Sequence, residues 1–260
     1  MNTSPSNSTA YSNFKKLHEQ DKPFLLANVW DAHSAKIAEN AGFKAIGTSS
    51  HAIANSMGYE DGEEISFEEM FFVVEHIIRA VNIPVSVDLE SGYSDDSQQV
   101  AQNVKRLTDL GVAGINLEDG TVKEGKRFLD DAEKLAQKIS AIKSECEIFI
   151  NARADTYVTE HPEALEESIR RAQIYAEAGA DGIFIPLMKS EAEIHVFTKK
   201  VELPLNVFIN AKLADYEKLG EWGVKRISHG AKQYELLMKK SEEIFKEFIQ
   251  SKDYKTILGN

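Results

Sequence analysis

Residues 84–93 read Pro84-Val85-Ser86-Val87-Asp88-Leu89-Glu90-Ser91-Gly92-Tyr93, a short apolar run that ends in two carboxylates and a glycine turn. In a β-strand, residues two apart share a face, so Asp88 and Glu90 are expected on one face and the apolar residues on the other. Two acids on one face cost free energy unless a positive group meets them. We therefore expect a divalent cation or an arginine at this strand end. The alternative is a loop with solvated acids, but the same pattern recurs along the chain.

Apolar strands and helical segments alternate through the rest of the sequence. Besides the run just described, strands are expected at 24–29, 45–50, 114–117, 148–152, 182–185, 205–209 and 225–228. Helices are expected near 31–41, 66–81, 96–110, 131–143, 162–178, 190–200, 212–222 and 231–250, with a polar loop over 120–130. Eight strands and eight helices are the count of a (β/α)8 TIM barrel. A doubly wound open sheet is the alternative, but no glycine-rich phosphate fingerprint follows the first strand.

Length and composition favour one large domain. The chain has 260 residues, of which 42% are hydrophobic, and no composition break suggests a second domain. Residues 1–12 are polar and are expected to form a disordered tail. They lack the basic region followed by an apolar one that marks a signal peptide. Residues 13–260 are expected to form the barrel, with a short helix over 14–19 that covers one end.

Charge and cysteine content exclude several classes of protein. The net charge is −12 and no basic stripe is present, which argues against nucleic acid as a partner. No run of 18 apolar residues occurs, so we expect no membrane span. The single cysteine, Cys146, excludes an internal disulfide and fits a reducing compartment. We expect a cytoplasmic protein.

Polar residues gather at the predicted strand ends, which is where a TIM barrel places its active site. These strand-end residues are Ser49, Asp88 with Glu90, Glu118, Arg153, Asn210 and His229. Three acids without a histidine or cysteine pair favour a hard, oxygen-preferring ion such as Mg²⁺. The planar fork of an arginine suits a substrate carboxylate.

Each of these residues also has a structural interpretation. Arg153 could simply neutralise the acids in an ion pair. His229 is interpreted as a hydrogen-bonded packing residue. Strand-end acids often cap the following helix, and Asp31, Asp119 and Asp130 are interpreted in that way.

Five segments together resemble the isocitrate lyase/phosphoenolpyruvate mutase superfamily, over nearly the whole chain from Phe24 to the final helix. They are Trp30-Asp31-Ala32-His33-Ser34-Ala35, Gly58-Tyr59-Glu60-Asp61, Asp88-Leu89-Glu90-Ser91-Gly92-Tyr93, Leu117-Glu118-Asp119 and Asn151-Ala152-Arg153-Ala154-Asp155. The resemblance implies a (β/α)8 barrel whose last helix is exchanged with a neighbouring subunit, in a homotetramer built as a dimer of dimers.

The resemblance also implies a Mg²⁺ site, with Mn²⁺ as an alternative ion. Asp88 would hold the ion directly, while Glu90, Glu118 and Asp61 would act mainly through metal-bound waters. A small 2-oxo acid would chelate the ion through its carboxylate and oxo oxygens.

Substrate contacts follow from the same resemblance. Ser49, the backbone amides of Ser50 and His51, and Arg153 would hold the substrate carboxylate. Asn210, at another strand end, is a further candidate for substrate binding.

The segment after the fourth strand departs from the family pattern. Isocitrate and methylisocitrate lyases carry a Lys-Lys/Arg-Cys-Gly-His segment there, and its cysteine serves in proton transfer. Residues 120–128 contain neither cysteine nor histidine, so the cysteine-dependent mechanism cannot be carried over. Phosphonopyruvate-acting members have an asparagine in this loop, and none lies between Gly120 and Asp131. Glu90 replaces the commoner aspartate.

We therefore favour a Mg²⁺-dependent carbon–carbon lyase that acts on a small 2-oxo or 2-hydroxy acid through an enolpyruvate-like intermediate. Decarboxylation of an oxaloacetate-type acid is its simplest version, because it does not need the missing cysteine. The candidate catalytic residues are Asp61, Glu118 and Arg153.

Two alternatives stay open. A phosphonopyruvate or phosphoenolpyruvate mutase or hydrolase would use Asp61 as nucleophile, with Lys123, Lys126 and Arg127 closing over a second anionic group. A 2-oxo acid binder without turnover is the alternative outside the enzymes.

Overall fold

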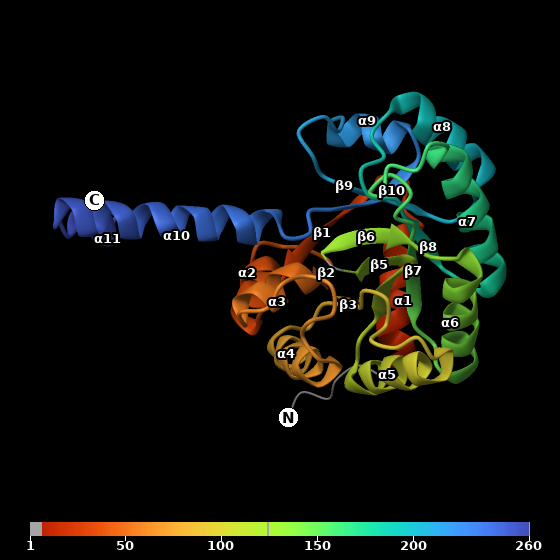
Figure 1. The fold of residues 1–260 in the computed structure, drawn as a ribbon, viewed down its shortest axis with the longest axis horizontal. Helices are drawn as coiled ribbons and strands as arrows, with labels where there is room; N and C mark the ends of the chain where they lie inside the picture. Colours follow the sequence, from red (N-terminus) through yellow and green to blue (C-terminus); the bar gives the residue numbers. More distant parts are fainter. Residues whose placement is uncertain (1–6, 124, 260) are drawn as a thin grey trace.

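Eight parallel strands close into a barrel in the described part of the chain (Figure 1). The structure is a computed structural model, and it describes residues 7–123 and 125–259. Around the barrel the strands follow the order β1-β10-β9-β8-β7-β4-β3-β2, so the predicted (β/α)8 fold is confirmed. The strands are Phe24–Val29 (β1), Ile46–Thr48 (β2), Val85–Asp88 (β3), Gly114–Glu118 (β4), Phe149–Arg153 (β7), Gly182–Phe184 (β8), Leu205–Phe208 (β9) and Val224–Ser228 (β10).

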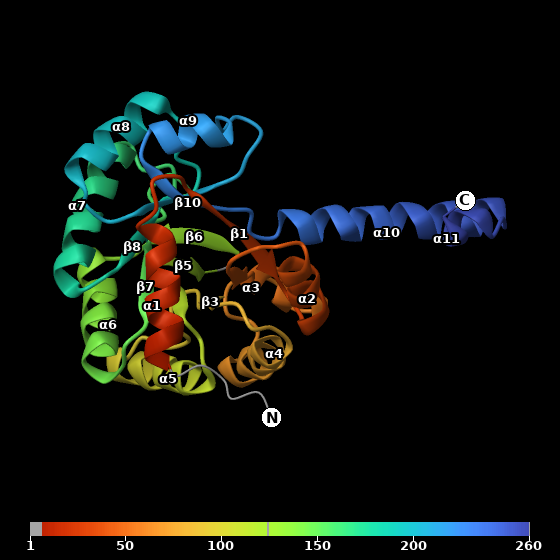
Figure 2. The ribbon, with the colours of Figure 1, turned by 180° about the vertical axis from the view of Figure 1, so that it is seen from behind.

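Most of the helices lie around the outside of the barrel, while the first crosses one end and the last two lead away from it (Figures 1 and 2). The helices of the described residues are Asn7–His18 (α1), Ala32–Asn40 (α2), Ser50–Ser56 (α3), Phe67–Ala80 (α4), Ser97–Leu110 (α5), Ala132–Glu145 (α6), Ala164–Ala178 (α7), Glu191–Lys200 (α8), Tyr216–Glu221 (α9), Lys232–Ser251 (α10) and Lys255–Leu258 (α11). Gly111 and Gly179 end α5 and α7 with φ near 106° and 105°, a backbone that glycine adopts without a steric cost. Across the described residues, no helix is both long enough and apolar enough to pass through a membrane.

The first helix begins earlier than the sequence predicted. Residues 7–12 were expected in a disordered tail but lie in α1, while residues 1–6 are outside the described part of the chain. The reason is a buried apolar side, because Ala10 and Phe14 pack against Phe149 and other residues from the starts of the strands. Figure 2 shows α1 lying across this end of the barrel, which confirms the predicted cover.

The segment after β4 was expected to be a loop but forms an antiparallel hairpin. Its strands are Gly120–Lys123 (β5) and Lys126–Leu129 (β6), with Gly120 opposite Leu129. Pairing of the two strands supplies hydrogen bonds to backbone N–H and C=O groups that would bond only water in an open loop. The hairpin lies on the face of the barrel opposite α1, as Figures 1 and 2 show together. The strand expected over 45–50 is also shorter, because Ser49 caps the short helix α3.

The barrel interior is polar in its middle layer. Arg226 of β10 is 1% exposed, and its Nη2 donates to Asn116 Oδ1 at 3.2 Å. Asn151 Nδ2 donates to the same oxygen at 2.9 Å and to Asn206 Oδ1 at 3.2 Å. Burial lowers the pKa of Arg226 to about 9. The asparagine layer supplies a partner for Nη2 alone, and Nε and Nη1 are buried without a hydrogen-bond partner among the described residues.

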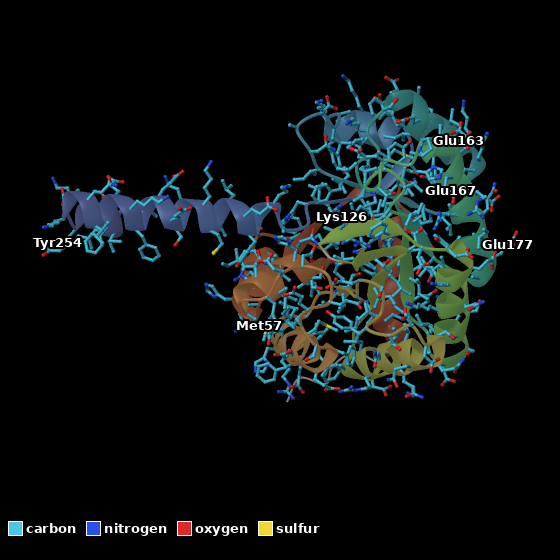
Figure 3. All side chains as sticks on the ribbon, in the orientation of Figure 1. Met57, Lys126, Glu163, Glu167, Glu177 and Tyr254 are labelled. Carbon is cyan, nitrogen blue, oxygen red and sulfur yellow. The ribbon has the colours of Figure 1, made fainter. Side chains whose placement is uncertain are left out.

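The last two helices form an arm that leaves the barrel (Figure 1). Tyr234 near its base is the one buried residue of α10 among those the structure describes, and Tyr254 near its tip is 71% exposed (Figure 3). Large apolar side chains along the arm are exposed, and they include Leu236, Leu237, Met238, Phe245 and Ile249. The exchange of this helix with a neighbouring subunit stays a prediction.

Replacing Phe14 by alanine should lower the free energy of unfolding by about 3–5 kcal/mol, because it opens a cavity under the barrel. Phe14 is fully buried and lies edge-on to Phe149, with ring centroids 5.3 Å apart. Urea unfolding followed by tryptophan fluorescence measures the change. Phe72→Ala is the control, because Phe72 is 60% exposed. Equal stability of the two variants would contradict the role given to α1.

Candidate active site

The carboxyl ends of β2, β3, β4 and β7 bring the predicted polar residues together beside the hairpin, which Lys126 marks in Figure 3. In the strand register, Asp88 lies opposite Asn116 and Glu118 lies opposite Arg153. A pocket of about 190 Å³ opens here, and its lining includes Glu63, Glu90, Ser91, Glu118 and Thr121. A larger cavity of about 630 Å³ lies beside α1 at the other end, where barrels place structural residues.

Asp88 is held in one orientation by residues of α3 and β4. Its Oδ2 accepts from Ser50 Oγ at 2.8 Å and from the Ser50 amide at 3.3 Å. Its Oδ1 accepts from Asn116 Nδ2 at 3.4 Å. Ser50, predicted to bind substrate, therefore orients Asp88 in this structure.

Glu118 is the centre of a buried ion-pair network. Its Oε2 accepts from Arg153 Nη1 at 2.7 Å, and its Oε1 accepts from Arg127 Nη1. Both arginines also bind Asp155, Arg153 through Nε at 2.7 Å and Arg127 through Nη1 at 2.9 Å. Burial raises the pKa of Glu118, while the charges of Arg153 and Arg127 lower it. The structural ion pair considered for Arg153 is thus present.

Glu90 lies in the cluster of acids, but its backbone conformation differs from the predicted one. It was placed on the same strand face as Asp88, but β3 ends at Asp88 and Glu90 lies in a turn with φ 50°. It is 4% exposed, and its Oε1 has no hydrogen-bond partner among the described residues. Burial, and then the charges of Glu118 and Asp61, raise the pKa of Glu90 to about 9.

Asp61 and His51 border the cluster and are more exposed. Asp61 Oδ2 lies 3.7 Å from His51 Nδ1 and 4.0 Å from Arg127 Nη2. Their side chains are 36% and 38% exposed, so both are open to solvent at the mouth. The charge of Asp61 acts on Glu90, so the two lie near each other, and the role that the resemblance implies for Asp61 stays a prediction.

Three strand-end residues have structural contacts. Ser49 Oγ accepts from the Ala52 amide at 3.3 Å and caps α3. Among the described residues, the Asn210 side chain bonds within its own loop, to Phe208 O and the Lys212 amide, and no hydrogen bond joins it to the acids. His229 Nε2 accepts from the Asn28 amide at 3.0 Å, which fits the packing role expected for it.

The helix-cap interpretation holds for one acid of three. Asp31 caps α2 in a capping box. The cap of α6 is Asp131 rather than Asp130. Asp119 is no cap, because its buried carboxylate accepts from Arg171 Nη1 at 2.9 Å.

Three residues that were not among the predicted site residues complete the site. Asn116 lies two residues before Glu118 on β4, so strand alternation was a signal for it. Asp155 lies beyond the end of β7, where alternation no longer applies. Arg127 was expected only to close over a second anionic group, and the hairpin instead brings it to Glu118 and Asp155.

The donor set fits a hard divalent cation. The candidate ligand atoms are carboxylate oxygens, which Mg²⁺ prefers. Glu90 Oε1 is buried beside other acids and has no hydrogen-bond partner among the described residues. Within residues 7–123 and 125–259, no three acid, histidine or cysteine side chains already converge as metal ligands. The reason is visible at Glu118, since both of its oxygens are bound by arginines.

Comparison with known proteins agrees with this geometry. A family model described as "Phosphoenolpyruvate phosphomutase" matches residues 14–249. An uncharacterized protein of Mycobacterium tuberculosis strain H37Rv is 37% identical over 222 residues, which cover 85% of this chain and 83% of the relative. A 2-methylisocitrate lyase of Aeropyrum pernix is 28% identical over 254 residues, which cover 94% and 81%.

Solved structures share the fold. A crystal structure from Burkholderia cenocepacia J2315, provisionally described as a phosphonomutase, is 37% identical with a TM-score of 0.86 over 93% of this chain and 99% of that one. Phosphonopyruvate hydrolase in complex with oxalate and Mg²⁺ is 22% identical, with a TM-score of 0.83 over 94% and 88%.

The raised pKa of Glu90 makes a prediction about stability and pH. Without divalent cations, Glu90 loses its proton near pH 4.5 in the unfolded chain but keeps it up to about pH 9 in the folded chain. The stability of the folded chain therefore falls as the pH rises from 4.5 to about 9. Glu90→Gln removes this cost. In EDTA we expect the variant to resist urea better than the wild type at pH 8, with a smaller difference at pH 5.

Glu177→Gln on α7 is the matched control, because Glu177 is exposed (Figure 3). It should change stability equally little at both pH values. A Glu90→Gln protein that is no more stable than the wild type at pH 8 would show that Glu90 does not carry this cost.

Proposed function

The chain belongs to the phosphoenolpyruvate phosphomutase family, within the isocitrate lyase/phosphoenolpyruvate mutase superfamily, and we propose that it is a Mg²⁺-dependent lyase of small 2-oxo acids. The favoured reaction is carbon–carbon cleavage through an enolpyruvate-like intermediate, with decarboxylation of an oxaloacetate-type acid as its simplest form. The observation that carries this proposal is the meeting of Asp88, Glu90 and Glu118 with Arg153 at one barrel mouth.

Arg153 is suited to hold the substrate carboxylate. A guanidinium has five N–H donors, and the three contacts to Glu118 and Asp155 leave two free. The same contacts fix the plane of the guanidinium, so a bound carboxylate would be oriented as well as neutralised.

Asp88, with Glu90 and Glu118, would hold the divalent cation. When bound, such an ion supplies Lewis-acid stabilisation of the negative charge that develops on the substrate. The Mg²⁺ in phosphonopyruvate hydrolase supports this requirement for the superfamily. Glu118, already neutralised by two arginines, would contact the ion through water.

The position of Cys146 supports a reaction that does not use a cysteine. Cys146 ends α6, and its sulfur contacts Thr108 Oγ1 at 3.5 Å, at the end of the barrel opposite the hairpin. Burial raises the pKa of its thiol, which disfavours the reactive thiolate. The hairpin itself offers Arg127 where lyases have their cysteine segment.

Carbon–phosphorus chemistry is the second candidate. Asp61 is partly exposed at the mouth, with Arg127 Nη2 4.0 Å away, an arrangement that would accept a phosphonate group. A phosphonopyruvate mutase or hydrolase would use Asp61 as its nucleophile.

We also propose that a second copy of this chain covers the arm, as the family resemblance implies. Leu25 on the outer face of β1 is 50% exposed, although the last helix of a barrel ordinarily packs near this strand. Here α10 leaves the barrel with its own apolar side chains exposed (Figure 3). Exchange of the arm between subunits would bury both surfaces.

Turnover should depend on the cation and on Arg153. The assay uses oxaloacetate, methylisocitrate, isocitrate and phosphonopyruvate, each with Mg²⁺ and with EDTA. We expect turnover of one acid, lost in EDTA, and a fall in kcat/KM of about 10²–10³ in Arg153→Lys, since lysine keeps the charge but not the fork.

Arg170→Ala is the control, because the Arg170 side chain is 53% exposed on α7. Product from phosphonopyruvate alone would select the second candidate. Saturable binding of a 2-oxo acid without product from any member of the panel would select a binder and contradict the enzyme.

The arm should control assembly. Phe245→Asp combined with Ile249→Asp places charge at positions that are 65% and 76% exposed in one chain, so it should leave the isolated chain folded and reduce the oligomer to monomers. Sedimentation velocity measures the mass, and Lys239→Glu on the same helix is the control. A double variant that sediments like the wild type would contradict the exchange.

A further inference from the structure

We propose that Glu63 is a positioning residue for Asp61. It joins the loop between α3 and α4 (residues 57–66, the Asp61 loop) to the turn after β3, and so sets the position of Asp61 beside Glu90. The proposal rests on the proposed function, because Asp61 and Glu90 matter through the cation and the substrate. Glu63 borders the pocket of the site, and we assign its action to its bonds with Ser91 and Tyr93 rather than to a bond with the cation or the substrate.

Glu63 makes three hydrogen bonds through a single carboxylate oxygen. Its Oε1 accepts from the Ser91 amide at 2.8 Å, from Ser91 Oγ at 2.8 Å and from the Tyr93 amide at 3.0 Å. The Gly92 amide between them donates instead to Leu89 O, at 2.9 Å. Hydrogen bonds to a charged acceptor are about twice as strong as those between neutral groups. One side chain thus joins two segments that each carry an acid of the site.

The backbone on both sides of this contact is in the left-handed region. Glu63, Glu90 and Tyr93 have φ values of 63°, 50° and 61°, and none of them is a glycine. Such conformations are strained for residues other than glycine and persist only where the surroundings impose them. The bonds to Glu63 are among the contacts that impose them on the turn.

A hydrogen bond from α6 also holds this turn. Lys138 on α6 is 8% exposed, and its Nζ donates to Ser91 O at 2.8 Å. Both backbone groups of Ser91 are therefore fixed, its carbonyl oxygen by Lys138 and its N–H by Glu63. The Asp61 loop, in contrast, reaches the turn only through Glu63 in the hydrogen bonds of the described residues.

The loop also fits closely against the hairpin. A Cβ on Gly62 would lie 3.0 Å from Val122 Cβ, so the backbone at Gly62 approaches β5 more closely than another residue would allow. With Glu63 fastened and Gly62 against the hairpin, Asp61 lies 4.0 Å from Arg127. Releasing Glu63 would therefore move Asp61 away from both Glu90 and Arg127.

Hydrogen exchange tests the contact without any need for turnover. In Glu63→Ala we expect the Ser91 and Tyr93 amides to exchange about tenfold faster or more, because their acceptor is lost. Glu63→Gln keeps an acceptor oxygen and should restore most of the protection. Glu64→Ala is the matched control, because Glu64 is exposed and bonds only the Glu60 amide of its own loop.

A second measurement separates positioning from simple stability. The Mg²⁺ concentration that gives half of the maximal rise in Tm should increase about tenfold or more in Glu63→Ala, as for other residues that orient metal ligands. Glu64→Ala should match the wild type. If Glu63→Ala does not fold, Glu63→Gln decides, with a smaller shift in the same direction.

Glu63 variants that match Glu64→Ala in amide exchange and in the Mg²⁺ midpoint would overturn the proposal. The two hypotheses fail separately. Faster exchange at Ser91 and Tyr93 without turnover of any acid would support the role of Glu63 and count against the lyase. Turnover with unchanged exchange would do the reverse.

Discussion

Buried charge at the barrel mouth is the constraint on which the rest of this structure depends. The side chains of Glu118 and Asp155 are 4% and 0% exposed, and each is bound by Arg153 and Arg127. Removing one partner of a buried pair leaves an uncompensated charge, at a cost of about 3–5 kcal/mol. Glu90 has no such partner among the described residues, and burial, followed by the charges of the neighbouring acids, raises its pKa. The excess of acids at the mouth is what supports the proposed cation site.

This constraint extends into the barrel. Asn116 donates to Asp88 while its carbonyl oxygen accepts from Asn151 and Arg226, so the amide has one orientation. The Arg226 guanidinium in turn lies over the ring of Phe14, 5.8 Å from its centroid. A continuous chain of contacts thus leads from the helix that covers one end to the carboxylate at the other. The polar interior supports the site as well as filling the barrel.

The predictable part of the site came from strand ends. Asp88, Glu118 and Arg153 could be brought together from sequence because parallel strands place their carboxyl ends at one face of a barrel. Glu90 was expected there for the wrong reason, since alternation along a strand does not describe a residue with φ 50°. Asn210 satisfied the same rule and yet bonds only within its own loop. A strand end locates a residue but does not orient its side chain.

The sequence by itself determined the order of strands and helices, the closed barrel and the face that carries the acids, because periodicity and turn residues are local properties of the chain. Only the tertiary structure decided which charges neutralise one another. The hairpin delivers Arg127 to Glu118, and Glu63 reaches a turn 28 residues away at Ser91. Such contacts depend on the distance between segments that are remote in sequence, and no local pattern records that distance.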